Sequence, residues 1–146
     1  MRQQDIAYEL AIKAHAGQFR RDGITPYFNH VQDVARIAQM RGGDDLVITA
    51  ALLHDVKENC GIDNECLEDY KFDESVIGAV NLLTLDKRIS YEDNIRLIKN
   101  ESKANIAGQI ALKVKLADNL SNLSDAPTDK QIIKYAKSLQ ILMGEH

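Results

Sequence analysis

The sequence predicts an all-α protein, a compact helical bundle that forms a single domain over residues 1–146. Apolar residues recur at helical spacing along nearly the whole chain, whereas the alternation typical of strands is scarce. Only two prolines occur, Pro26 and Pro127, so the long stretch between them can form uninterrupted helices. A hydrophobic content of 45% in 146 residues is enough for a core without disulfides.

We expect about seven helices. The first ends near Gly17, and the glycines and proline of the following segment, GQFRRDGITPY, predict a loop. The second ends at a pair of glycines that begins with Gly42. The third has Asp44 or Asp45 as its N-cap and runs through LVITAALLHDVKE to the neighbourhood of Gly61.

The rest of the chain continues the helical pattern. The acidic segment DNECLEDYKFDE predicts a short helix and a turn with a solvated face. Further helices are expected over residues 74–84, from Ser90 onward, over about 104–124, and after Pro127, where Thr128 and Gln131 form a capping box. No linker, repeat or low-complexity segment divides the chain, and we expect no second catalytic domain.

The composition excludes several classes of protein. The chain has 18 basic and 22 acidic side chains, and this net charge of −4 argues against binding to extended nucleic acid. The apolar run from Val47 to Leu53 is too short to cross a membrane, and the N-terminus, MRQQDIAYEL, is too polar for a signal peptide. Two cysteines without a CxxC pattern suit a reducing cytosol, so we expect a cytoplasmic protein.

A histidine and an aspartate end a strongly apolar segment. His54 and Asp55 follow the run AALL, where a pair of ionisable groups is costly unless it has a partner. Glu58 lies four residues after His54, and on one continuous helix all three side chains project into one sector. The spacing therefore predicts an imidazole and two carboxylates within reach of one point.

The longest expected helix repeats this pattern. Asp118 stands between apolar residues in KLADNLSNL, and Asn122 lies one turn later on the same face. A divalent metal that also binds His30 would give these groups a partner, because imidazole and carboxylate ligands suit manganese, iron, zinc or magnesium. The residues by themselves favour a different interpretation, in which His54 is an ordinary core histidine and the aspartates, Asp118 included, are caps or ion-pair partners.

The order of these residues resembles that of a known enzyme family. His30, the pair His54-Asp55 and Asp118 fall on successive helices, as in the H…HD…D signature of the HD-domain metal-dependent phosphohydrolases. The blocks AHAGQFRRDGITPYFNH, VARIA, AALLHDVKE and VKLADNLSN, in that order, are similar to the hydrolase domain of the RelA/SpoT homologue family, including its small stand-alone members. The resemblance covers residues 5–125. It implies an HD-type helical domain that removes the 3′-pyrophosphate from guanosine tetra- and pentaphosphate (ppGpp and pppGpp).

The resemblance also implies a metal centre and its chemistry. Its four ligands would be His30, His54, Asp55 and Asp118. The metal would be manganese, with iron, zinc or magnesium as alternatives, and would activate a water as the nucleophile. Glu58 and Asn59 stand where the family has a Glu-Asp pair that orients or activates this water. Asn59 is a departure, because an amide can neither accept a proton nor hold a charge.

Substrate contacts are implied at three further residues. Arg20 and Arg21 match a basic pair that engages the base and the phosphates, and Asn122 matches an asparagine that contacts the nucleoside. Asp125 stands where the family often has threonine, and its carboxylate could repel a phosphate. The partner would then be a small phosphorylated nucleotide, with a homo-oligomer left open.

Two other functions remain open because of the departures from the family pattern. The protein could hydrolyse a different nucleotide or phosphoester, or it could be a catalytically degenerate module that binds metal and nucleotide without turnover. Lys57, where an apolar residue is common in the family, is expected at the surface, with compensation of phosphate charge as the alternative. His15 is expected to be structural, and the terminal His146 is assigned to no site.

Overall fold

Nine helices follow one another along residues 2–144, the part of the chain that the computed structural model describes: α1 (Gln3–Ala14), α2 (Phe28–Met40), α3 (Asp45–Leu53), α4 (Val56–Cys60), α5 (Asn64–Asp69), α6 (Glu74–Leu83), α7 (Tyr91–Ser102), α8 (Ile106–Leu123) and α9 (Asp129–Met143). The predicted all-α class is confirmed, and His146 lies outside the described residues. No helix within 2–144 has the length and apolar character that a membrane span requires.

Polar residues begin several helices where the sequence predicts them. Asp44, Ser90 and Thr128 each accept a hydrogen bond from the backbone N–H three residues further on. Each bond satisfies an amide that has no partner inside its own helix. Gly61 ends α4 in the left-handed conformation, with φ of 68°, which glycine adopts without steric cost.

The third expected helix is not continuous, and this break adds one helix to those named from the sequence. α3 ends at Leu53 and α4 begins at Val56, with Asp55 at φ −110° and ψ 0° between them. In a continuing helix the carbonyl of Ala51 would accept from the amide of residue 55. Here the imidazole Nδ1 of His54 lies 2.6 Å from that carbonyl oxygen and takes its place. The single helix predicted through residue 61 is therefore wrong.

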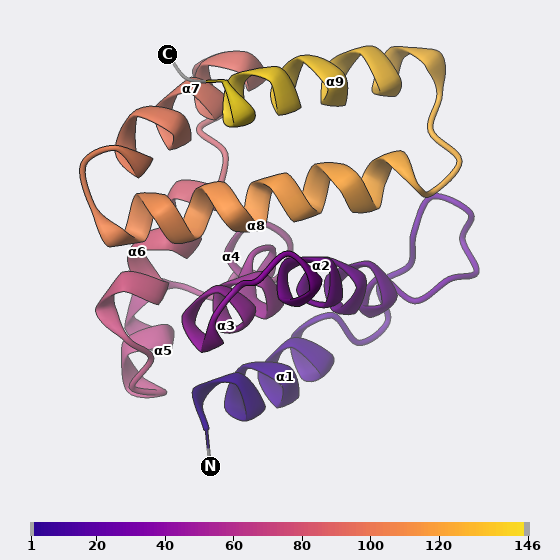
Figure 1. Ribbon diagram of the computed structural model, residues 1–146. Helices are drawn as coiled ribbons and strands as arrows, with labels where there is room; N and C mark the ends of the chain where they lie inside the picture. Colours follow the sequence, from indigo (N-terminus) through magenta and orange to yellow (C-terminus); the bar gives the residue numbers. More distant parts are fainter. Residues whose placement is uncertain (1, 145–146) are drawn as a thin grey trace.

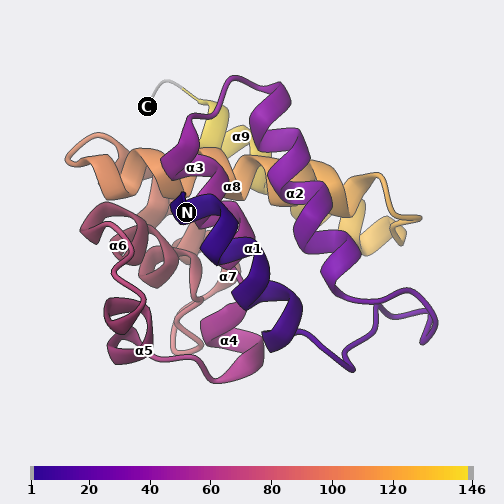
Figure 2. The same cartoon turned by 90° about the horizontal axis from the view of Figure 1, so that it is seen from below.

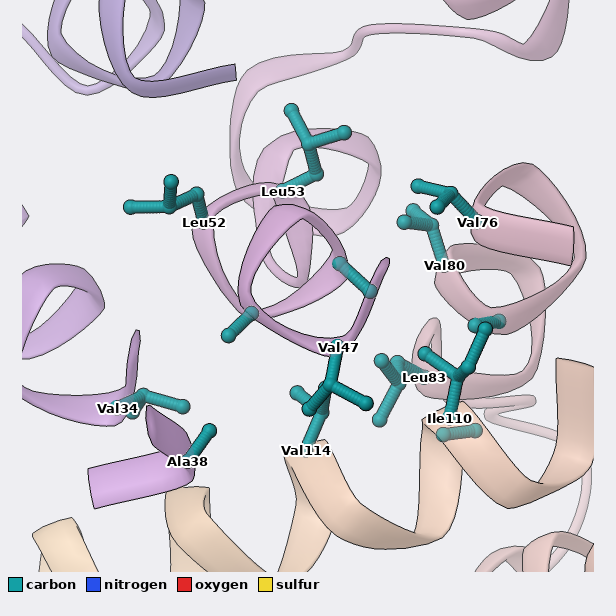
Figure 3. Close-up of a cluster of buried hydrophobic side chains, with 14 of the residues drawn as sticks. Val34, Ala38, Val47, Leu52, Leu53, Val76, Val80, Leu83, Ile110 and Val114 are labelled. Carbon is teal, nitrogen blue, oxygen red and sulfur yellow. The ribbon is translucent and has the colours of Figure 1, made fainter. Parts of the chain in front are cut away.

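The hydrophobic core is built around α3, whose side chains face three other helices. Figure 3 shows buried side chains of α2, α6 and α8 gathered around those of α3: Val34, Ala38, Val47, Leu52, Leu53, Val76, Val80, Leu83, Ile110 and Val114. Burying this apolar surface holds the ends of these helices in fixed positions. His54 and Asp55 follow the core segment of α3 directly.

Three parts of the chain that are distant in sequence meet at one side of the bundle. α8 runs through the middle of the molecule, with α7 and α9 on one side and α2 and α3 on the other (Figure 1). The loop of residues 15–27 extends beyond the bundle between α1 and α2 (Figure 2). A single β-bridge between Phe19 and Pro26 pairs the two arms of this loop. The arrangement places the loop, the start of α2, the α3–α4 junction and α8 around one site.

Candidate metal centre

The four predicted metal ligands come together at this site. One ligand atom each of His30, His54 and Asp55 lies within 4.8 Å of the other two. Oδ1 of Asp118 lies 3.0 Å from Nε2 of His30 and 3.7 Å from Nε2 of His54. The structure thus brings all four side chains together, from α2, the α3–α4 junction and α8.

His54 points a lone pair into the centre of this group. The carbonyl oxygen of Ala51 can only accept, so the Nδ1 atom 2.6 Å from it carries the ring proton. In the neutral ring, Nε2 is then unprotonated, and this buried atom has no hydrogen-bond partner among the described residues. It nevertheless lies 3.0 Å from Oδ2 of Asp55. A lone pair that faces a carboxylate is unfavourable unless a cation, either a proton on Nε2 or a metal ion, lies between them.

The surrounding charges also favour a cation at this point. Burial acts to lower the pKa of His54, but the negative charges of Asp55 and Asp118 outweigh it and raise the pKa well above its ordinary value. Burial acts to raise the pKa of Asp55, but His54 and the Tyr27 hydroxyl, which donates to Oδ2 at 2.6 Å, hold it at about 2. The donor set of imidazole nitrogens and carboxylate oxygens therefore fits a divalent metal ion.

Lys115 holds the carboxylate of Asp118, the fourth predicted ligand, in its ionised form. Its buried ammonium lies 3.0 Å from Oδ2 of Asp118, while Oδ1 of the same carboxylate faces the two histidines. Burial acts to raise the pKa of Asp118, but the charge of Lys115 and the contacts with the histidines lower it well below its ordinary value. One oxygen of Asp118 thus remains directed toward the candidate metal position.

A cavity of about 290 Å³ opens over these ligands. It is lined by Phe19, Arg20, Arg21, Tyr27, His30, Asp55, Asp118, Asn122, Gln131 and Tyr135. A neighbouring hollow of about 310 Å³ shares Arg20 and His30 with it. Together they offer the volume and the polar groups of a small-ligand site. A larger cavity of about 490 Å³ between α1, α2 and α3 contains none of the predicted site residues.

The three predicted substrate-binding residues all line the cavity, and two of them are linked. The guanidinium of Arg20 donates to Oδ2 of Asp125 at 2.7 Å and to Oδ1 of Asn122 at 3.4 Å, and lies over the ring of Tyr27. Asn122 in turn donates to Oδ1 of Asp118 at 3.3 Å. Asp125, expected to act on the substrate, instead pairs with Arg20. Arg21 is exposed at the same opening.

The predicted catalytic pair lies to one side of this cavity. Glu58 and Asn59 do not line it. They lie on α4, which does not continue α3 because the helix breaks after Leu53. Glu58 is half-buried, and burial together with the charge of Asp55 raises its pKa. The Asn59 side chain is exposed. Lys57 is half-buried and donates to Asn64 and Asn81, so it is less exposed than predicted.

Several residues at the site were not predicted from the sequence. They are Asp33, Lys115, Ser121, Gln131 and Tyr135, together with the hydrogen bond of Tyr27 to Asp55. Helical spacing could have found two of them, since Lys115 and Ser121 lie three residues before and after Asp118 on the same face of α8. Gln131 and Tyr135 carry no such signal, because only the tertiary fold brings α9 over the cavity.

His15 lies behind the predicted metal ligands. It is buried and contacts the Gln18 side chain through Nδ1 at 2.9 Å, and its ring packs against that of Tyr27. Burial lowers the pKa of His15 and raises that of the neighbouring Cys60 thiol. Gln18 occupies Nδ1 of His15, and neither His15 nor Cys60 lines the cavity, so the structural role of His15 stays a prediction.

Comparison with known proteins identifies this arrangement. The sequence matches the HD domain family over residues 7–141. The chain belongs to the HD domain family. This HD domain is 38% identical over 121 residues to the guanosine-3′,5′-bis(diphosphate) 3′-pyrophosphohydrolase MESH1 of Drosophila melanogaster, covering 80% of this chain and 65% of that protein. It is 39% identical over 122 residues to the MESH1 protein of Xenopus tropicalis, covering 82% and 66% respectively.

A solved structure resembles the HD domain over nearly its full length. It is described as a metazoan orthologue of SpoT that hydrolyses ppGpp and plays a role in starvation responses. The TM-score is 0.77 at 33% identity, and the match covers 97% of this chain and 86% of the other. The resemblance predicted from the sequence blocks is confirmed. The chain spans just under two thirds of the length of the curated MESH1 relatives.

Proposed function

We propose that this protein is a metal-dependent nucleotide pyrophosphohydrolase that removes the 3′-pyrophosphate from ppGpp and pppGpp. The observation that carries the proposal is the convergence of two buried imidazoles and two carboxylates beneath a cavity lined by arginines. The relatives named above, which are hydrolases of this class, support the same substrate.

The metal ligands in this proposal are His30, His54, Asp55 and Asp118. A divalent cation bound there supplies Lewis-acid chemistry, which makes a water more acidic and withdraws charge from a phosphoryl oxygen. Both imidazoles present Nε2 to Oδ1 of Asp118 and would direct it toward the ion, while Lys115 keeps that carboxylate ionised. Manganese as the preferred ion and a cytoplasmic location stay predictions.

The remaining residues bind the nucleotide and move the proton. Arg20 and Arg21 provide guanidinium groups that form paired hydrogen bonds to phosphate oxygens. Arg20 can exchange Asp125 for a phosphate, because the Asp125 side chain is 55% exposed and an ion pair open to water contributes only about 0–1 kcal/mol. Glu58, whose pKa is raised toward the working pH, takes the proton from the attacking water, whereas Asn59 is exposed outside the cavity and takes no part in this step.

The direct test is turnover with a defined metal content. The purified protein is loaded with Mn²⁺, its bound metal is measured, and ppGpp is added. We expect guanosine diphosphate and free pyrophosphate in equal amounts, and no products after the metal is removed with a chelator. A protein that holds metal but releases no pyrophosphate would contradict this substrate, whereas a protein that holds no metal would contradict the centre itself.

A second candidate function is hydrolysis of a less highly charged nucleotide or phosphoester. The ion pair between Arg20 and Asp125, 2.7 Å long, supports this alternative because it neutralises one of the two arginines at the cavity. A panel of nucleotides and phosphate esters, each assayed with Mn²⁺, Fe²⁺, Zn²⁺ and Mg²⁺, separates the two functions. Faster turnover of substrates that lack a 3′-pyrophosphate would favour the second.

A further inference from the structure

A chain of hydrogen bonds leads from His30 away from the cavity. Nδ1 of His30 lies 3.1 Å from Oγ of Ser121 on α8, and this hydroxyl donates to Oδ2 of Asp33 at 2.8 Å. Oδ1 of Asp33 accepts two hydrogen bonds from the guanidinium of Arg36, at 2.6 and 3.2 Å. The four residues connect the candidate metal centre with the exposed face of α2.

The direction of these bonds follows from the chemistry of the carboxylate. Burial acts to raise the pKa of Asp33, but the bonds from Arg36 and Ser121 outweigh it and lower the pKa. An ionised carboxylate can only accept, so the single hydroxyl hydrogen of Ser121 is directed toward Asp33. The serine oxygen then has only lone pairs to offer His30, and Nδ1 of the imidazole must be the protonated nitrogen. Nε2 is left with the lone pair, 3.0 Å from Oδ1 of Asp118.

We infer that Ser121 and Asp33 are positioning residues that fix the tautomer and the ring orientation of His30 for metal binding. The inference rests on the proposed metal centre. His54 is held in the same tautomer by a backbone carbonyl, that of Ala51, which no substitution removes. His30 depends on side chains alone for this constraint, so its orientation can be changed by mutation. Partners of this kind, behind the ligands, typically change metal affinity by about 10–100-fold.

The test compares metal affinity in matched variants. Mn²⁺ and Zn²⁺ affinities are measured by competition with a chromophoric chelator for the wild type, Ser121→Ala and Asp33→Asn. We expect about 10–100-fold weaker binding in both variants. Ser121→Thr keeps the hydroxyl and adds a methyl group beside the 310 Å³ hollow that Ser121 lines. This variant should retain most of the affinity.

Two control variants remove similar groups at a distance from the centre. Ser138→Ala deletes the hydroxyl of another buried serine, which has no hydrogen-bond partner among the described residues. Asp93→Asn weakens another aspartate–arginine pair three residues apart, with Arg96 at 3.0 Å on the surface of α7. Both controls should bind metal as the wild type does. Thermal unfolding of every variant shows whether a loss of affinity is only a loss of folding.

The double variant tests whether the two residues act through one path. If Asp33 acts on His30 only through Ser121, Ser121→Ala with Asp33→Asn should lose no more affinity than the weaker-binding single variant. Fully additive losses would contradict the connected path. A folded Ser121→Ala variant with wild-type affinity would overturn the inference and leave the metal centre standing. A wild type that binds no metal would overturn both this inference and the proposed function.

The NMR signature of the imidazole gives a readout that is independent of affinity. Nitrogen chemical shifts of ¹⁵N-labelled histidine distinguish a protonated Nδ1 from a protonated Nε2. With Zn²⁺ bound, His30 of the wild type should show a protonated Nδ1 that is hydrogen-bonded. In Ser121→Ala this nitrogen should lose the shift of a hydrogen-bonded group, whereas in Ser138→Ala it should not. Identical spectra for all three proteins would contradict the role of Ser121.

Discussion

The floor and the rim of the candidate site are stabilised in different ways. The floor consists of His30, His54, Asp55 and Asp118, and the rim consists of Arg20, Arg21, Asn122 and Asp125. The histidine side chains of the floor are 3% exposed and the carboxylate of Asp118 is 9% exposed. At the rim, the side chain of Asp125 is 55% exposed although it forms an ion pair.

This difference in exposure means that contacts at the floor must be kept, whereas contacts at the rim can be exchanged. Removing a charge from water costs several kcal/mol, so the charged groups of the floor are stable only while each has a partner. The ion pair of Arg20 and Asp125 is open to water on the Asp125 side, and solvent-exposed pairs contribute about 0–1 kcal/mol, so this contact is more easily replaced. The floor is therefore suited to hold one cation, and the rim is suited to exchange protein contacts for those of a substrate.

The largest effect is expected when Asp118 is removed from the floor. Asp118→Ala should abolish metal binding and leave the buried ammonium of Lys115 without its partner. The expected destabilisation is about 3–5 kcal/mol, as for other broken buried ion pairs, and is measured by denaturant unfolding. Full metal stoichiometry in the variant would show that Asp118 is not a ligand.

A second substitution separates the two consequences of losing Asp118. In the double variant Asp118→Ala with Lys115→Met, no unpaired buried charge remains, so much of the stability should return. Metal binding should stay absent, because the carboxylate is still missing. If metal binding returned together with stability, Asp118 would act only through the fold.

The next largest effect is expected at Glu58. Glu58→Gln should lower kcat by about 10²–10⁴-fold, the usual contribution of a general base, with metal content unchanged. Glu65→Gln, an exposed position on α5, serves as the control. A rate that is unaffected by Glu58→Gln would assign proton transfer to another group.

The pH dependence gives a second measurement of the same residue. Burial and the charge of Asp55 raise the pKa of Glu58 above 4.5. A base must be ionised to accept a proton, so kcat should fall as the pH decreases through this raised pKa. The acid limb of the profile should therefore lie above pH 4.5 and disappear in Glu58→Gln.

The same contrast explains which parts of the structure could be predicted from the sequence. Caps such as Asp44 and Thr128 are local, so the sequence is sufficient to place them. The proximity of the floor residues could be predicted because they fall within sequence blocks shared with a family. The break after Leu53 could not be predicted, because it depends on a contact between the His54 side chain and a backbone carbonyl. Tyr135 was missed because only tertiary packing brings α9 to the cavity.

A smaller effect is expected at the rim. Arg20→Ala should raise KM for ppGpp by about tenfold, which corresponds to the loss of one charged hydrogen bond, and should change kcat little. Asp125→Asn should lower KM, because Arg20 no longer has to leave a carboxylate partner to bind phosphate. Arg96→Ala, which breaks a surface ion pair on α7, is the control. A higher KM in Asp125→Asn would mean that Asp125 helps to bind the substrate.

The smallest effect is expected at Asn59, the departure from the family pattern in the predicted catalytic pair. Its side chain is exposed and outside the cavity, so an acid restored there would stay in water, where its charge is screened. Asn59→Asp should therefore change kcat/KM by less than about fivefold, or about 1 kcal/mol. Steady-state kinetics with Mn²⁺ and ppGpp measure this change directly. A large gain over a near-zero background would instead identify the natural protein as a degenerate binding module, and would place Asn59 with the floor rather than with the solvent-exposed surface.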